Sequence, residues 1–273
     1  MTARTYLFVP GDRPERFEKA LASGADVVVL DLEDAVVPER KSLARDAIAA
    51  WLGRASGAER ERAAVRVNDV ASPWFAGDLA MLAAAGVAQV MLPKAESADP
   101  IAAVRAAMPE AAVLALIESA RGVAQVDAVA SAPGVSRLVF GTLDFALDLG
   151  IEIEHSAAGL AYAASRIAIA SRAAGLPAPV AGVTPELGDE ARLLADLAWA
   201  RGLGFGAKLC IHPQQVAPLH AALAPSDAQL DWARRVIDAA SGQAGAVQLD
   251  GRMVDKPVLQ RARDLLARAN RQS

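Results

Sequence analysis

The strongest constraint on the fold is a regular alternation of short aliphatic runs with alanine-rich helical segments. Eight runs rich in β-branched and aliphatic residues begin about 20 to 40 residues apart, which is the length of one strand plus one crossover helix. Continuous apolar strands that alternate with helices are typical of parallel sheets buried on both faces. The runs are YLFVPG (6–11), VVVLDLE (27–33), AAVRVND (63–69), QVMLPK (89–94), AVLALIES (112–119), RLVFGTLDF (137–145), PVAGVT (179–184) and FGAKLCIH (205–212).

The number of repeats indicates the architecture. Eight strand–helix units are the count of a (β/α)8 TIM barrel, and we predict that residues 1–222 form one. Two helical stretches, 226–241 and 256–270, flank a turn-rich piece after the barrel. We therefore predict a C-terminal helical extension at 223–273 that could cover its own barrel mouth or a neighbour's. The alternative is a doubly wound open sheet with an appended helical tail.

Composition excludes several classes of protein. With 53% hydrophobic and 22% charged residues, the 273-residue chain can bury a large core and is not disordered. It has 28 basic and 32 acidic residues and no basic stripe, so we expect no nucleic-acid partner. One cysteine, Cys210, and three histidines exclude a disulfide framework and a Cys/His zinc site. Pro10 and nearby charges interrupt any secretory leader, and no apolar stretch could span a bilayer, so we expect a cytoplasmic protein with no membrane partner.

Charged residues gather at the C-terminal ends of the predicted strands, where a barrel places its active site. Alternate side chains share a strand face, so we place Asp31 with Glu33, and Lys208 with His212, on faces turned away from the helices. Charged groups inside parallel strands are costly unless they are paired or metal-bound. The pattern therefore predicts a charged barrel mouth, and so an enzyme. Its other members are Arg66, Asn68, Lys94, Glu118 and Asp144.

Glu118 and Asp144 form the sharpest pair in this pattern. They end consecutive predicted strands, so their carboxylates could converge across a strand spacing of roughly 5 Å. Two carboxylates at that range repel each other unless a proton or a cation lies between them. Mg2+ suits such a site, because it binds few protein carboxylates and keeps several water or substrate oxygens. The alternative is that each carboxylate pairs with a nearby base such as Arg121.

Arg66 points inward from the third predicted strand, and its position is equally consistent with two roles. Its planar guanidinium fits a substrate carboxylate in a bidentate manner, or it forms a structural ion pair with Asp31 or Glu33. For Asp31, Glu33 and Asp34 we expect support of basic neighbours or of metal-bound water rather than direct chemistry.

The remaining polar residues of the strand ends have less specific roles. We predict ion pairs within the barrel for Lys94 and Lys208, with a Schiff base at a desolvated lysine as the alternative. We expect Cys210 to pack in the core, and His212 to cap a helix or to support the site.

Seven segments, in order along the chain, resemble one family: YLFVPGDRPERFEKA, SGADVVVLDLEDAVVPERK, RVN, LPK, LIESARG, FGTLDFALDLG and GAKLCIHPQQV. They resemble the citrate lyase β-subunit-like family, within the HpcH/HpaI aldolase and malyl-CoA lyase superfamily. The similarity runs from residue 4 to about residue 216, and DGRMVDKPVLQRAR extends it to about residue 263.

The resemblance implies a (β/α)8 barrel that binds Mg2+ and assembles as a trimer or a hexamer. By position, Glu118 and Asp144 match the family's metal ligands, and Arg66 matches the arginine that holds the carboxylate of a 2-oxo acid. Asp255 matches an acid/base aspartate that a neighbouring subunit supplies in relatives. The same aspartate could also cap the N-terminus of the last helix.

The resemblance also implies a reaction. Phe8, Arg13 and Lys19 match positions that contact coenzyme A. The implied activity is reversible cleavage of a 3-hydroxyacyl-CoA carboxylate, such as malyl-CoA or citramalyl-CoA, into an acyl-CoA and a 2-oxo acid. The alternatives are a malyl-CoA thioesterase and a citrate lyase β subunit acting on a carrier-bound thioester. The stretch PVAGVTPELGD, with Ala181 before Gly182, departs from the acidic pattern of many relatives, so the resemblance does not fix the substrate.

Overall fold

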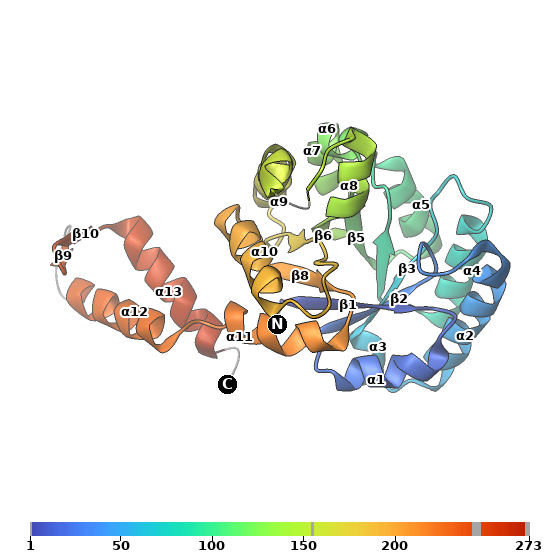
Figure 1. Cartoon of the computed structure of the whole chain (residues 1–273), viewed down its shortest axis with the longest axis horizontal. Helices are drawn as coiled ribbons and strands as arrows, with labels where there is room; N and C mark the ends of the chain where they lie inside the picture. The colour runs from blue at the N-terminus through green and yellow to red at the C-terminus, as the bar shows by residue number, and fades with distance from the viewer. Residues whose placement is uncertain (1, 154–155, 242–246, 271–273) are drawn as a thin grey trace. The chain divides into compact units, whose positions relative to one another are not determined.

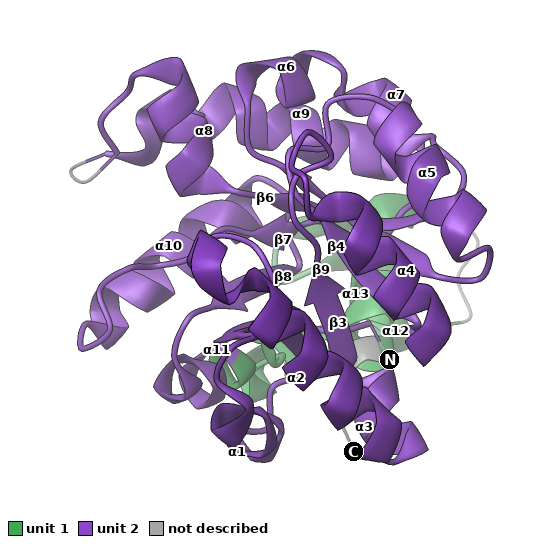
Figure 2. Cartoon of the chain, turned by 90° about the vertical axis from the view of Figure 1, so that its right-hand side faces the viewer, with its two compact units in different colours: residues 1, 220–273 green, residues 2–219 purple. Residues whose placement is uncertain are grey.

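The chain divides into two compact units, a large one at 2–219 and a small one at 220–273, and each is described by itself (Figure 2). The division lies within helix α11 (Val216–Leu223), and the boundary predicted from the sequence, after residue 222, falls in the same helix. The structure is a computed structural model and describes residues 2–153, 156–241 and 247–270.

All eight predicted strands form in the large unit. They run parallel and close into a barrel in chain order, with β1 hydrogen-bonded to both β2 and β8 (Figure 1). The (β/α)8 prediction is therefore confirmed, and the open-sheet alternative is wrong. The strands are β1 (Thr5–Pro10), β2 (Val27–Asp31), β3 (Ala63–Arg66), β4 (Gln89–Leu92), β5 (Ala112–Ile117), β6 (Val135–Phe140), β7 (Val180–Ala181) and β8 (Ala207–Cys210).

The barrel is solid because alternate strand residues fill its interior. Side chains such as Val29, Leu114 and Leu209 form one buried cluster to which every strand contributes. The residues between them are buried as well: Val28 and Leu30 are each 1% exposed. Burial on both faces explains why the strands read as continuous apolar runs in the sequence.

Helices surround the barrel (Figure 1). Two of them, α4 and α8, end at Gly86 and Gly150, whose positive φ angles favour glycine at a helix C-terminus. None of the described helices is long and apolar enough to span a membrane. The helices of the large unit before α11 are α1 (Phe17–Ala22), α2 (Lys41–Arg54), α3 (Gly57–Glu61), α4 (Phe75–Ala85), α5 (Asp99–Ala107), α6 (Ala120–Ala124), α7 (Val126–Ala130), α8 (Thr142–Leu149), α9 (Ala161–Ala173) and α10 (Glu190–Gly202). Four short 3-10 helices complete it: η1 (Pro14–Arg16), η2 (Pro38–Arg40), η3 (Ala157–Leu160) and η4 (Pro213–Gln215).

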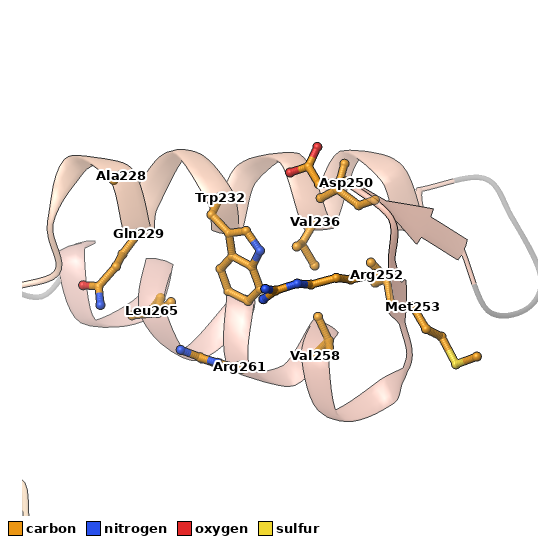
Figure 3. A pocket seen from close by; sticks show the side chains of 12 residues that line it. Ala228, Gln229, Trp232, Val236, Asp250, Arg252, Met253, Val258, Arg261 and Leu265 are labelled. Atoms are coloured by element: carbon orange, nitrogen blue, oxygen red, sulfur yellow. The ribbon is translucent and has the colours of Figure 1, made fainter. Parts of the chain in front are cut away.

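The small unit is a helical hairpin with a two-stranded tip. Both predicted helical stretches form, as α12 (Asp227–Ala240) and α13 (Lys256–Asn270), and the antiparallel strands β9 (Val247–Leu249) and β10 (Arg252–Val254) join them. Ala233, Val236, Val254 and Ala262 form its small core. A cavity of about 600 Å3 opens between the two helices, where the Arg261 guanidinium lies 5.3 Å from the Trp232 ring centroid (Figure 3).

Candidate active site

Glu118 and Asp144 line one cavity at the C-terminal end of the barrel, as predicted, but they reach it from different kinds of element. Glu118 directly follows β5. The prediction that Asp144 ends the sixth strand is wrong, because β6 stops at Phe140 and Asp144 lies in the first turn of α8. Gly141 leaves the extended conformation there, and its position allows no side chain, since an added Cβ would lie 2.6 Å from the Cβ of Glu118. The run RLVFGTLDF therefore contains both a strand and a helix start.

Within the described residues, neither carboxylate has a basic partner. Arg121, the predicted alternative, pairs with Glu96 instead, at 3.7 Å. Burial raises the pKa of Glu118 to about 7, and the charge of Asp144 adds to the rise. Burial also raises the pKa of Asp144, followed by the charge of Asp34. Glu118 is buried and Asp144 is exposed, and two carboxylates that repel each other without a base between them form a site for a cation.

The number of available carboxylates favours a magnesium-type ion. No cluster of three or more His, Cys, Asp or Glu side chains that could hold a metal occurs in the described ranges. Mg2+ is usually held by one or two carboxylates together with water and substrate oxygens. The pair of Glu118 and Asp144 matches that donor set, whereas zinc would require three or four protein ligands.

Arg66 ends β3 inside a cage of carboxylates. Its Nε and Nη2 donate to the two carboxylate oxygens of Asp31, at 2.7 and 2.6 Å. Its Nη1 lies 2.8 Å from Glu33 and 3.5 Å from Asp34. The structural ion pair is therefore present, yet Arg66 also lines the cavity. A guanidinium has five N–H donors, and hydrogen bonds to Asp31 engage two of them. The ion pair with Asp31 and Glu33 is therefore compatible with binding of a substrate carboxylate by Arg66.

The loop after β2 holds this cage in place. Asp31 accepts hydrogen bonds from the backbone N–H groups of Glu33 and Ala35, at 2.9 and 3.1 Å, which fixes a tight turn. Lys41, which the sequence reasoning missed, is 6% exposed and donates to the carbonyl oxygens of Leu32 and Glu33. Burial raises the pKa of Glu33 to about 8, against the lowering effect of Arg66. Asp31 and Glu33 thus support Arg66, as expected.

Lys94 supports the site through its backbone. Its N–H donates to Oε1 of Glu118 at 2.8 Å, and its φ of 45° is unusual for a residue other than glycine. The side chain forms an ion pair with Asp69 at 3.3 Å, so the ion-pair prediction for Lys94 is confirmed. The amide leaves Oε2 of Glu118 without a hydrogen-bond partner among the described residues.

The three residues that match coenzyme A contacts lie in different environments. Phe8 lines the cavity, and its ring centroid lies 4.7 Å from the Arg66 guanidinium carbon. Arg13 and Lys19 are exposed, at the start of η1 and in α1, and neither lines the cavity. Asp12, in the same loop, pairs with Arg40 at 2.5 Å. The structure thus brings Phe8 to the predicted site and leaves the two basic residues on the surface.

Asp255 belongs to the small unit. Its Oδ1 accepts a hydrogen bond from the N–H of Val258 at 3.1 Å, so it caps the N-terminus of α13, as the sequence predicted. The side chain is exposed within the unit, and its acid/base role stays a prediction.

The predictions for Lys208, in β8, and for His212, just after β8, have different outcomes. Lys208 does not face the mouth: its neighbours Ala207 and Leu209 fill the barrel interior, so it points toward the helices. It forms no ion pair with a described residue and donates instead to the carbonyl oxygen of Gly182 at 2.7 Å. His212 caps η4, because its Nδ1 accepts from the N–H of Gln214 at 3.2 Å. The ion-pair prediction for Lys208 is therefore wrong, and the capping prediction for His212 is confirmed.

The cavity that contains Glu118 and Asp144 has a volume of about 210 Å3, and more carboxylates than basic groups line it. Its acidic members are Asp31, Asp34, Glu118 and Asp144, and Arg66 is its basic member. Leu116, Val183, Leu209 and Ile211 give it an apolar wall. Such a site can hold a divalent cation beside a carboxylate-bearing organic ligand.

Known proteins share this sequence and fold. Residues 4–213 match the sequence model of the HpcH/HpaI aldolase/citrate lyase family. A citrate lyase subunit beta-like protein of Mycobacterium tuberculosis is 39% identical over 269 residues, which cover 97% of this chain and 94% of the relative. A (3S)-malyl-CoA thioesterase of Cereibacter sphaeroides is 34% identical over 271 residues, with coverages of 97% and 94%. The structure of CitE from Mycobacterium tuberculosis in complex with magnesium, acetoacetate and coenzyme A is similar, with a TM-score of 0.88, 36% identity, and coverages of 98% of this chain and 99% of that one.

Proposed function

The chain belongs to the HpcH/HpaI aldolase/citrate lyase family, a family of lyases, and from that premise we propose a Mg2+-dependent carbon–carbon lyase. The substrate is a 3-hydroxyacyl-CoA carboxylate such as malyl-CoA or citramalyl-CoA. The products are an acyl-CoA and a 2-oxo acid, and the reaction is reversible. One observation carries the proposal: the buried Glu118 and the exposed Asp144, neither of which pairs with a base among the described residues, share a cavity with the caged Arg66.

The residues of the cavity have different proposed roles in binding the metal and the substrate. Glu118 and Asp144 would hold Mg2+, which would supply Lewis-acid stabilisation of negative charge on substrate oxygens. Arg66 uses its remaining N–H donors to fix the carboxylate of the oxo-acid part. Because Asp31 and Glu33 hold Arg66 in one orientation, little rearrangement is needed when the substrate binds.

In cleavage, the 3-hydroxyl group loses its proton to solvent and becomes the carbonyl of the oxo acid. The carbon–carbon bond breaks, and its electron pair stays on the thioester enolate, which must receive a proton. We assign the donor role to the carboxyl group of Asp255, and the reverse proton removal to its carboxylate. In the proposed assembly, a homotrimer or hexamer, this residue comes from the small unit of a neighbouring subunit. Phe8, Arg13 and Lys19 are assigned to the coenzyme A part, the two basic residues to its phosphates.

A thioesterase is the second candidate, because the similar Cereibacter sphaeroides protein is a (3S)-malyl-CoA thioesterase. The same cavity would then direct water at the thioester, and the products would be malate and free coenzyme A. The third candidate is a citrate lyase β subunit that acts on a carrier-bound thioester.

A two-product assay separates these candidates. Purified protein is given malyl-CoA or citramalyl-CoA with Mg2+, and 2-oxo acid and free thiol are followed together, with EDTA and Glu118→Gln as controls. Oxo acid without thiol, lost in both controls, supports the lyase. Thiol without oxo acid overturns the lyase in favour of the thioesterase. No turnover by folded protein overturns both and leaves the carrier-bound substrate.

Subunit complementation tests the role of Asp255. Asp255→Ala and Glu118→Gln should each be inactive alone. In mixed oligomers, each site needs one intact group from each of two chains, so random assembly should restore about a quarter of the wild-type activity. No recovery in mixed oligomers of confirmed composition would show that the aspartate does not act across the subunit boundary.

A further inference from the structure

A second cavity, of about 120 Å3, lies on the outer side of β7 and β8. Lys208 lines it from the helix-facing side of β8, since the flanking residues Ala207 and Leu209 fill the barrel interior. Asp196 and Trp199 line it from α10. No role in the proposed reaction uses this cavity.

Lys208 is a buried basic group that forms no ion pair with any residue that the structure describes. It is 2% exposed, and its Nζ donates to one protein acceptor among the described residues, the Gly182 carbonyl. An ammonium group has three donors, so two are left. Asp196, on the facing helix, is already engaged: it accepts from Thr184 Oγ1 at 2.6 Å and pairs with Arg192 at 2.8 Å. Burial lowers the pKa of Lys208 to about 8, although the charge of Asp196 opposes the fall.

The rest of the lining is mainly apolar. Leu143, Ile153, Leu160 and Trp199 form apolar walls, and Thr142 adds a hydroxyl group. Besides Lys208, the charged members of the lining are Glu186, Arg192 and Asp196. A buried cation with spare donors favours an anion, and the apolar walls favour a carbon chain over a hydrated inorganic ion. The size suits a small molecule, since a cavity of roughly 150 Å3 is enough to hold benzene.

We propose that this cavity binds a short aliphatic monocarboxylate of up to about four carbon atoms. The carboxylate accepts hydrogen bonds from Lys208 Nζ and the Thr142 hydroxyl, and the alkyl chain packs on Leu160 and Trp199. The inference goes beyond the proposed reaction and does not depend on it.

The position of the cavity gives its occupant a route to the active site. Thr142, Leu143 and Val183 line both this cavity and the one that contains Glu118 and Asp144. Thr142 begins α8, two residues before Asp144. A bound carboxylate therefore contacts the same helix turn that positions one of the proposed metal ligands.

Titration calorimetry with butyrate at pH 7 tests the proposal. Lys208→Met removes the ammonium group at similar volume, and Ala157→Leu narrows the cavity while it keeps Lys208. Lys256→Met, at the start of α13, is the matched control. Wild type and control should bind one butyrate per chain. The two cavity variants should bind at least about tenfold more weakly, a loss of about 1.4 kcal/mol.

Three results would overturn the assignment. No butyrate binding by the wild type would remove the site. Butyrate binding by both Lys208→Met and Ala157→Leu with the affinity of the wild type would place the carboxylate elsewhere, such as at Arg66. Tighter binding of bicarbonate or phosphate than of butyrate would show that the cavity takes an inorganic anion. If Lys208→Met does not fold, butyrate binding by Ala157→Leu and the comparison of butyrate with bicarbonate and phosphate still test the proposed site.

Discussion

The barrel mouth and the cavity behind β7 and β8 each bury one basic side chain, and they treat it in opposite ways. Arg66 points inward from β3 and is surrounded by Asp31, Glu33 and Asp34. Lys208 points outward from β8 and meets a single carbonyl. Burial acts to lower the pKa of both groups, but the nearby carboxylates raise that of Arg66, whereas that of Lys208 falls. The same barrel thus holds one basic group in ion pairs with carboxylates and one that forms no ion pair with a described residue.

The difference shows what each region is suited to. A caged guanidinium has a fixed orientation before the substrate arrives, which is useful where geometry decides the rate. The Lys208 ammonium, which forms no ion pair with a described residue, has unused donors in a mainly apolar cavity, and a ligand with a negative charge can accept hydrogen bonds from them.

The largest expected effect on stability comes from removing the guanidinium of Arg66 from its surrounding carboxylates. Arg66→Met leaves Asp31 and Glu33 buried without a cation, which should lower the free energy of unfolding by about 3–5 kcal/mol. Lys208→Met leaves no unpaired charge, so its stability should equal or exceed that of the wild type at pH 7. Urea unfolding of both variants measures the contrast, and a larger loss for Lys208→Met than for Arg66→Met would contradict it.

The second effect is a pH dependence that Lys208 should produce and Arg66 should not. Its pKa is about 8 in the folded chain, against the ordinary lysine value of 10.5 that applies to the unfolded chain, so between these values the unfolded chain binds more protons. The stability contributed by this residue should therefore rise as the pH increases from 8 to 10.5.

The groups that face Lys208 are present in both proteins. Asp196, Arg192 and Cys210 remain in Lys208→Met, so the difference from wild type isolates the lysine. Urea unfolding at pH 7, 8.5 and 10 should show the variant losing its advantage as the pH rises. A constant difference would mean that the lysine keeps its usual pKa.

A smaller effect is expected at the ring beside the cage. Phe8→Leu removes the aromatic face 4.7 Å from the Arg66 guanidinium, a contact expected to contribute about 0.5–2 kcal/mol. If Arg66 binds the oxo acid, KM for the oxo acid in the condensation direction should rise several-fold while kcat changes little. Steady-state kinetics check this, and a fall in kcat at constant KM would assign Phe8 a different role.

The smallest effect is expected at Lys94. Its side chain is 51% exposed in an ion pair with Asp69, and such pairs contribute at most about 1 kcal/mol. The contact with Glu118 uses the backbone N–H, which Lys94→Met retains. Activity should remain near the wild-type level. A large loss would show that the ammonium group itself takes part in the reaction.

The sequence predicted the features that depend on local patterns. Buried strands read as apolar runs, so all eight strands were placed, and capping residues such as His212 and Asp255 were recognised. For Arg66, the sequence left open whether it pairs with Asp31 or Glu33 or binds a substrate carboxylate. The spacing of residues along a strand shows which side chains share a face, but it gives no distances between them.

Other features required the three-dimensional structure. Lys208 was assigned to the wrong face, because a strand buried on both sides has apolar neighbours in either direction. Asp144 was assigned to a strand, because β6 passes into α8 within one apolar run. The role of Lys41 depends on two carbonyl groups that a turn earlier in the chain brings near it, and no sequence motif marks that contact.

The central claim is that Glu118 and Asp144 hold a divalent cation. Titration of EDTA-stripped protein with Mg2+ tests it most directly, in wild type, Glu118→Gln and Asp144→Asn. One Mg2+ site per chain is expected in the wild type, and each variant should lose more affinity for Mg2+ than the roughly 10–100-fold typical of residues that support metal ligands. Unchanged Mg2+ affinity in both folded variants would contradict it.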